Sequence, residues 1–214
     1  MGSYQDRVYL EALRIEAGES IQFFSNKMKP DRELSTCVAF LRCIGIDFDS
    51  QEILSCKSEP VDVCFREARF QVREVLDEGR RRHDELKAAR DRLFAAESLS
   101  HLVEPYRPPT PLRYSEVVEI LVEVLKEKAA RYGRAQCAQL DALVYINLRQ
   151  RTLDANSVFP SVSDLCSQGW RSVSFVMPMY ARVVCAEDSA PDFLRRFMAE
   201  TRCDCKNPPT LFDY

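Results

Sequence analysis

Glycine is scarce in this chain of 214 residues, which contains only six. These glycines form no glycine-rich loop of the kind that cradles a nucleoside triphosphate, so we exclude the P-loop proteins. The chain also lacks an apolar run approaching the ~20 residues of a membrane span. The polar residues 1–7 are not followed by the apolar core of a secretory signal. These absences predict a cytoplasmic protein with no membrane contact.

Paired cysteine motifs are also missing, although the chain has nine cysteines. The cysteines are odd in number, scattered, and nowhere spaced as C-x-x-C. In a cytoplasmic protein of this size, this pattern predicts reduced thiols rather than a disulfide framework.

Neither positive nor negative charge is in large excess, since 30 basic and 33 acidic residues give a net charge of −3 and a pI near 5.6. A global field that attracts a polyanion is therefore absent, which excludes a constitutive nucleic-acid coat protein. A nuclease, or an interaction module with one local basic patch, stays open. The 46% hydrophobic and 29% charged residues are typical of a globular protein with a sizeable core.

Hydrophobic periodicity predicts helices separated by short strands. We expect helices near residues 6–28, 31–44, 77–100, 115–132, 161–168 and 191–200. We expect strands near residues 46–48, 61–65, 70–73, 141–148, 172–176 and 181–185. A proline-rich extended connector covers residues 104–113. This order predicts a single α/β domain with a mixed sheet flanked by helices.

The segment 61–73 alternates apolar and polar residues and is predicted to form a β-hairpin. A turn at Glu67-Ala68 would set Phe65 opposite Phe70. The same register would place Asp62 opposite Arg73, with Gln71 beside them on the polar face.

These residues carry a family resemblance. Pro60-Val61-Asp62 and then Gln71-Val72-Arg73 resemble the motif of the PD-(D/E)xK nucleases, and Glu33 lies on the preceding helix, where many members place a further acid. The run 67–81 is similar to that of an uncharacterised bacterial family of putative endonucleases. The resemblance implies a restriction-endonuclease-like fold, with residues 31–148 as the nuclease-like core and 149–214 as a C-terminal strand-strand-helix extension.

The implied activity is metal-dependent hydrolysis of nucleic acid. In this interpretation Asp62 and Glu33 bind Mg²⁺, Gln71 is a neutral ligand and Arg73 contacts phosphate. The motif is degenerate, because Gln71 brings no charge and an arginine cannot act as a base. The alternative is a catalytically inactive nuclease-fold protein that acts as a nucleic-acid or protein interaction module. A functional site would leave Asp62 in a cleft, whereas a structural role would pack it against Gln71.

The densest basic run is Arg80-Arg81-Arg82 at a predicted helix start, where it could contact nucleic-acid phosphates. The flanking acids favour the alternative of a solvated helix with pairs such as Arg80 with Asp84. The sequence predicts no oligomeric state.

Overall fold

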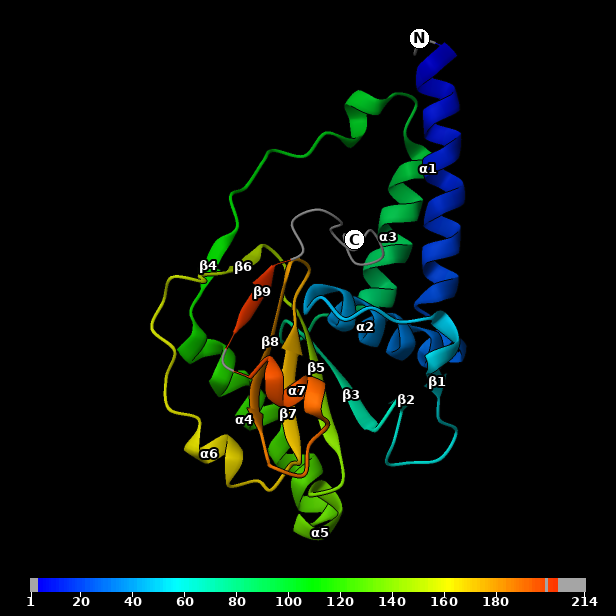
Figure 1. Ribbon diagram of the computed structural model, residues 1–214. Helices are drawn as coiled ribbons and strands as arrows, with labels where there is room; N and C mark the ends of the chain where they lie inside the picture. Colours follow the sequence, from blue (N-terminus) through cyan, green and yellow to red (C-terminus); the bar gives the residue numbers. More distant parts are fainter. Residues whose placement is uncertain (1–3, 199, 204–214) are drawn as a thin grey trace. The chain divides into compact units, whose positions relative to one another are not determined.

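The structure is a computed structural model that describes residues 4–198 and 200–203 (Figure 1). Its described residues form two compact units. Unit 1 comprises residues 4–32 and 78–108, and unit 2 comprises residues 33–77 and 109–203.

Unit 1 is a helical unit built on α1 (Tyr4–Phe23) and α3 (Arg82–Ala95), which lie side by side. The Nε of Arg14 on α1 donates to the carbonyl of Leu93 at 3.2 Å, and its Nη2 donates to the carbonyl of Ala96 at 3.1 Å. Arg82 at the start of α3 stacks on Phe24, with 4.3 Å between the guanidinium carbon and the ring centre. Short 3₁₀ helices cover Asn26–Met28 and Leu99–Leu102.

Unit 2 contains a seven-stranded mixed sheet in the order β1-β2-β3-β5-β7-β8-β9. The sheet is antiparallel from β1 to β3, parallel from β3 through β5 to β7, and antiparallel from β7 to β9. Its strands are β1 (Ile53–Ser55), β2 (Val63–Phe65), β3 (Ala68–Leu76), β5 (Asp141–Asn147), β7 (Ser172–Val176), β8 (Tyr180–Ala186) and β9 (Thr201–Cys203). A separate two-stranded sheet pairs β4 (Thr110–Leu112) with β6 (Arg151–Leu153).

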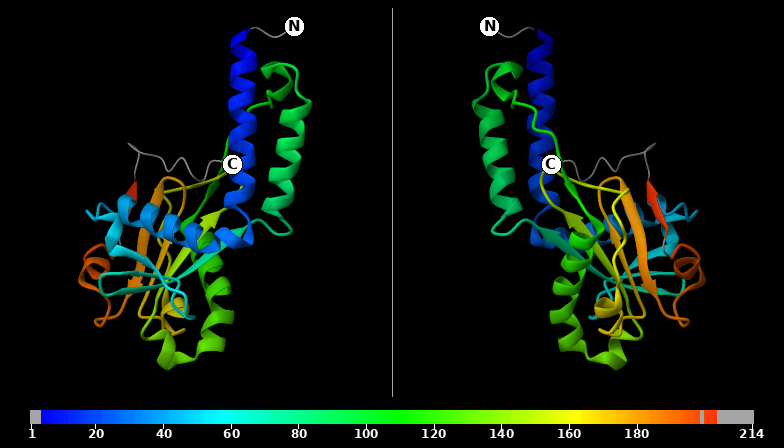
Figure 2. Two further views of the ribbon diagram at one scale, coloured as in Figure 1. Left: turned by 90° about the vertical axis from the view of Figure 1, so that its right-hand side faces the viewer. Right: turned by 90° about the vertical axis from the view of Figure 1, so that its left-hand side faces the viewer.

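Helices cover both faces of the large sheet, so the core has two layers (Figure 2). One layer packs α2 (Lys29–Cys43) and α7 (Asp192–Arg196) on side chains such as Phe70 and Leu143. The other packs α4 (Tyr114–Tyr132) and α6 (Ser163–Cys166) on side chains such as Val144. The short helix α5 (Arg134–Cys137) follows α4, and a 3₁₀ helix, Ser50–Glu52, precedes β1.

The predicted α/β class and mixed sheet flanked by helices are therefore confirmed. The strand predicted at 141–148 is the central strand β5, whose seven residues are all buried, and the strand predicted at 172–176 is β7. The proposed division into a core at 31–148 and an extension at 149–214 stays a prediction. β7 and β8 continue the same sheet beyond residue 148.

Several element boundaries differ from the prediction. Residues 46–48 form no strand, and β1 lies instead at Ile53–Ser55, in a segment predicted to be a loop. Here Asp49 and Glu52 form a reciprocal capping box that starts the 3₁₀ helix before β1. The helix predicted at 77–100 is shortened to α3, and the strand β9 was not predicted.

A search for membrane spans gives a negative result. In the described part of the chain, no helix combines the length and the apolarity needed to cross a membrane.

Candidate functional site at the β2–β3 hairpin

The hairpin brings Asp62, just before β2, next to Gln71 on β3. The observed register pairs Val63 with Phe70 and Phe65 with Ala68, and the backbone N–H of Asp62 donates to the carbonyl of Phe70 at 2.9 Å. The predicted facing of Asp62 with Arg73 is therefore wrong.

The error comes from the position of the turn. Residues 66 and 67 connect the strands, and Arg66 adopts a positive φ of 50°. The guanidinium of Arg66 donates to Glu52 at 2.9 Å and to the carbonyl of Asp47 at 3.0 Å. These contacts hold a turn that contains no glycine, asparagine or aspartate to mark it.

The carboxylate of Asp62 is held by two donors of β3. Its Oδ2 accepts from the side-chain amide of Gln71 and from the backbone N–H of Val72, the latter at 2.8 Å. The Gln71 side chain is buried with 5% exposure, and its Oε1 accepts from the hydroxyl of Tyr132 on α4 at 2.6 Å. The amide of Gln71 thus directs its nitrogen to Asp62 and its oxygen to Tyr132. Asp62 is packed against Gln71, which is the arrangement expected of a structural carboxylate.

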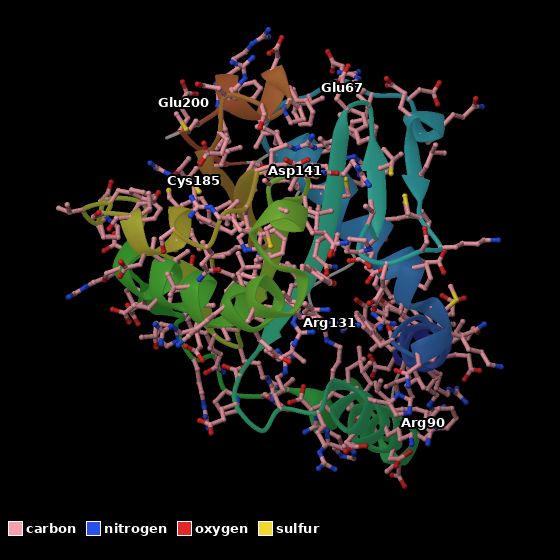
Figure 3. All side chains as sticks on the ribbon, turned by 90° about the horizontal axis from the view of Figure 1, so that it is seen from below. Glu67, Arg90, Arg131, Asp141, Cys185 and Glu200 are labelled. Atoms are coloured by element: carbon pink, nitrogen blue, oxygen red, sulfur yellow. The ribbon has the colours of Figure 1, made fainter. Side chains whose placement is uncertain are left out.

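Basic side chains surround this network. The Nζ of Lys128 donates to the Tyr132 hydroxyl at 3.3 Å and lies 5.4 Å from the centre of its ring. The guanidinium carbon of Arg131 lies 5.9 Å from the same ring, and Arg131 pairs with Glu59 at 2.9 Å (Arg131 is labelled in Figure 3). Arg73 is exposed and follows Gln71 by two residues, so it projects from the same face of β3. We name Arg73, Lys128 and Arg131 the basic trio.

The donor set for Mg²⁺ is poor. Within residues 4–198 and 200–203, no group of three or more His, Cys, Asp or Glu side chains is placed to hold a metal ion. The one oxygen of Asp62 that faces β3 already accepts two N–H groups, and the oxygen of Gln71 points elsewhere. Glu33 lies half-buried on α2. These residues therefore do not fit the ion, and Mg²⁺ binding stays a prediction.

Two thiols adjoin the network, and the sequence analysis gave them no role. The Sγ atoms of Cys56 and Cys64 lie 2.7 Å apart, and the backbone N–H of Cys56 donates to the carbonyl of Asp62 at 2.8 Å. Burial, followed by the hydrogen bond with Cys64, raises the pKa of the Cys56 thiol to about 11. A thiol with so high a pKa is a weak nucleophile at neutral pH.

The predicted reduced state agrees with seven described cysteines, which are free thiols. Cys203 differs, because it is disulfide-bonded.

A second buried polar cluster surrounds Asp141 at the start of β5, where the sequence analysis saw only an apolar strand (Figure 3). The fully buried carboxylate accepts from the guanidinium of Arg171, from the hydroxyl of Ser172 at 2.8 Å and from the backbone N–H of Arg69 at 2.9 Å. Arg171 also donates to the carbonyl of Glu67 at 3.1 Å. Because these partners lie on or beside β7 and on β3, the cluster joins β5 to β7 and to the hairpin.

The three arginines at 80–82 have different surroundings. Arg80 forms an ion pair with Glu85 at 2.9 Å, Arg82 is buried on Phe24, and Arg81 is exposed. Joint contact of the three with a phosphate stays a prediction, and this arrangement does not favour it.

Comparison with known families accounts for nearly the whole chain. Residues 5–205 match the family described as "Putative endonuclease, protein of unknown function (DUF1780)". The chain belongs to this family. The resemblance to an uncharacterised family of this description is therefore confirmed, whereas the relationship to the PD-(D/E)xK nucleases is not tested by it.

A solved structure of another protein is similar to this chain. It is a protein of unknown function from Pseudomonas aeruginosa strain PAO1, described as belonging to the monooxygenase superfamily. The two share 30% sequence identity with a TM-score of 0.66, over 91% of this chain and 93% of that one. No curated protein matches the chain.

Proposed function

We propose that this protein binds nucleic acid on a nuclease-like scaffold and contacts the phosphate backbone through the basic trio. The observation that carries the proposal is the hydrogen bond from the amide of Gln71 to the carboxylate of Asp62, which supports a structural role for the motif. This is the catalytically inactive alternative of the sequence analysis, with nucleic acid as the partner.

The order of elements in unit 2 supports the nuclease-like scaffold. In this unit the helix α2 is followed by the meander β1-β2-β3, the short strand β4, the crossover helices α4 and α5, and the parallel strand β5. Four of these strands are adjacent in the sheet in the order β1-β2-β3-β5. This is the element order that the resemblance to the PD-(D/E)xK nucleases implies, and the family is described as putative endonucleases.

The charges near Gln71 support contact with a polyanion. Arginine and lysine supply most contacts to phosphate oxygens, and such contacts position a protein without reading sequence. In the basic trio, Glu59 neutralises Arg131 in part, while Arg73 is exposed beside a buried network. Because the net charge of the chain is −3, binding depends on this local patch.

A second candidate is metal-dependent hydrolysis of nucleic acid, which the description of the family favours. It requires Asp62 and Glu33 to bind Mg²⁺ and Gln71 to release the carboxylate. The two candidates differ in what Asp62 does. In the first it supports the fold, and in the second it is needed for cleavage.

The binding proposal is tested by fluorescence anisotropy with a labelled duplex of mixed sequence in EDTA. We expect a Kd that weakens with added salt, and a loss of about three- to tenfold in affinity for Arg73→Met, because each lost phosphate contact removes counterion release. Lys128→Met should act in the same direction. Arg196→Met, at an exposed arginine of α7, is the matched control and should bind as the wild type does. Equal affinities in all four proteins would exclude the basic trio as the contact.

A further inference from the structure

A second feature of unit 2, away from the hairpin, is the buried cation of Arg182 on β8. Its exposure is 9%, so its guanidinium is almost fully removed from water. Its strand β8 lies between β7 and β9 (Figure 1). Arg182 is opposite Phe175 on β7 and Thr201 on β9.

Two aromatic rings lie against this guanidinium. The guanidinium carbon lies 3.7 Å from the ring centre of Phe159 and 5.3 Å from that of Tyr114. The two rings contact each other edge to face at 5.2 Å. The N–H groups of a guanidinium lie in its plane, so its N–H edge still needs polar acceptors beside these ring contacts.

That edge is short of acceptors in the protein. Nη1 donates to the hydroxyl of Thr201 at 3.0 Å, while the buried Nε has no hydrogen-bond partner among the described residues. No carboxylate in residues 4–198 and 200–203 forms an ion pair with Arg182. A buried charge normally has an opposite charge and a full set of hydrogen bonds, because desolvation otherwise costs several kcal/mol. Within the described residues, therefore, no anionic group balances the charge of Arg182.

The surroundings add positive potential. Tyr114, which contacts Arg182, is the first residue of the 19-residue helix α4, and helix N-termini favour anions. Arg151 approaches the same helical turn by pairing with Glu116 at 2.6 Å, and its buried Nε also has no described partner. The acid Glu116 is thus taken by Arg151. The loop that brings Phe159 is fixed to this turn, since the N–H of Tyr114 donates to Ser157 at 3.0 Å.

We infer that Arg182 is the base of a binding site for a small free oxyanion, a phosphate or carboxylate group. The anion accepts from the N–H edge of Arg182, on the side of Nε. Thr201 fixes the orientation of the Arg182 guanidinium, and the loop of Phe159 covers the bound anion. This site lies on β8 and α4's first turn, uses none of the residues of the basic trio, and does not depend on the proposed function.

Thermal unfolding at increasing inorganic phosphate tests the inference, with sodium chloride keeping the ionic strength constant. We expect a saturable rise in Tm for the wild type, as for any ligand that binds only the native state. Arg182→Met keeps an apolar stem for the two rings and removes the guanidinium. We expect it to weaken the apparent phosphate affinity by about tenfold or more, because charge-assisted hydrogen bonds are lost. Arg196→Met should retain the wild-type response.

Thr201→Val provides a second variant if Arg182→Met does not fold. It leaves the charge in place, frees the orientation of the guanidinium, and should also weaken phosphate binding. A parallel titration with acetate identifies the class of anion, and saturation by either ion supports the site. The absence of a saturable response to both ions, or equal affinity in Arg182→Met and wild type, would overturn it. Displacement of phosphate by a short DNA duplex would assign the site to a nucleic-acid backbone and overturn the small-anion assignment.

Discussion

Asp62 accepts hydrogen bonds from a side-chain amide and from a backbone N–H of the neighbouring strand, so its removal leaves two donors of β3 without an acceptor. For Asp62→Ala we expect a loss of about 2 to 3 kcal/mol in the free energy of unfolding, since bonds to a charged acceptor are lost while one buried and one half-buried donor remain. Urea unfolding followed by circular dichroism measures the change.

Asp188→Ala is the matched control for this variant, because Asp188 is exposed in the turn after β8. Its stability should stay within about 0.5 kcal/mol of the wild type. An Asp62→Ala protein as stable as the control would contradict a structural role for Asp62.

Cys56 makes stability depend on pH. Burial and the hydrogen bond with Cys64 raise its pKa from 9.0 to about 11 in the folded state. A raised pKa means that the folded state holds the proton of Cys56 more tightly than the unfolded state does. The contribution of this proton to the free energy of unfolding is therefore complete below pH 9.0 and is lost as the pH rises towards about 11. We therefore expect the stability of the wild type to fall more steeply over this window than that of Cys56→Ala. Unfolding curves at a series of pH values test this, and parallel slopes would show that Cys56 does not titrate as described.

At the scale of elements, Arg14 joins the two helices of unit 1. The last carbonyls of a helix have no intrahelical partner, and a cation near them also interacts favourably with the helix dipole. Arg14 supplies hydrogen-bond donors and a positive charge to the C-terminal end of α3, where it bonds to the carbonyls of Leu93 and Ala96.

We expect Arg14→Met to increase amide hydrogen exchange in the last turn of α3 and to destabilise unit 1 by about 1 kcal/mol. Hydrogen exchange with mass spectrometry resolves this segment. Arg7→Met, at an exposed position of the same helix, should leave exchange in α3 unchanged. Faster exchange in both variants would point to a general effect of charge rather than to capping.

The elements that could be predicted from sequence are those whose signal is strong and local. β5 is near-continuously apolar because helices cover it on both faces, and α4 ends at Gly133, which adopts a positive φ of 74°. The short strands β1 and β9 have three residues each, too few for a periodicity to appear.

The register of the hairpin could not be predicted from its pattern. Moving the partner of each β2 residue by two positions along β3 leaves every side chain on the same face of the sheet, because side chains alternate with a period of two. The apolar pattern is therefore satisfied by the predicted pair Val63–Val72 and by the observed pair Val63–Phe70. The hairpin itself was predicted, but its internal pairing depends on a turn fixed by Arg66 and Glu52, which are distant in sequence.

Tertiary contacts also decide the partners that the sequence left unassigned. Tyr132 reaches Gln71 because α4 crosses the sheet, and Arg171 reaches Asp141 because β7 lies beside β5. Neither pair has a signal in local spacing, so the contact of Tyr132 with Gln71 and the buried cluster around Asp141 were not predicted.

At the scale of the whole molecule, the chain belongs to a family described as putative endonucleases, and its motif is held by its own hydrogen bonds. We therefore expect a protein that binds nucleic acid and does not depend on a divalent ion at Asp62. The basic trio and the Arg182 site are separate on the sheet, so Arg182→Met should leave duplex binding unchanged.

Calorimetric titration of Mn²⁺ into the protein bound to a short DNA duplex tests the central claim most directly, with wild type and Asp62→Asn compared. Asparagine keeps the shape of the side chain and an acceptor for β3 while removing the charge that a metal requires. We predict the same heats for both proteins, and an intact duplex after the titration. Saturable Mn²⁺ binding that disappears in Asp62→Asn, together with cleavage by the wild type alone, would contradict the account and establish a metal-dependent nuclease.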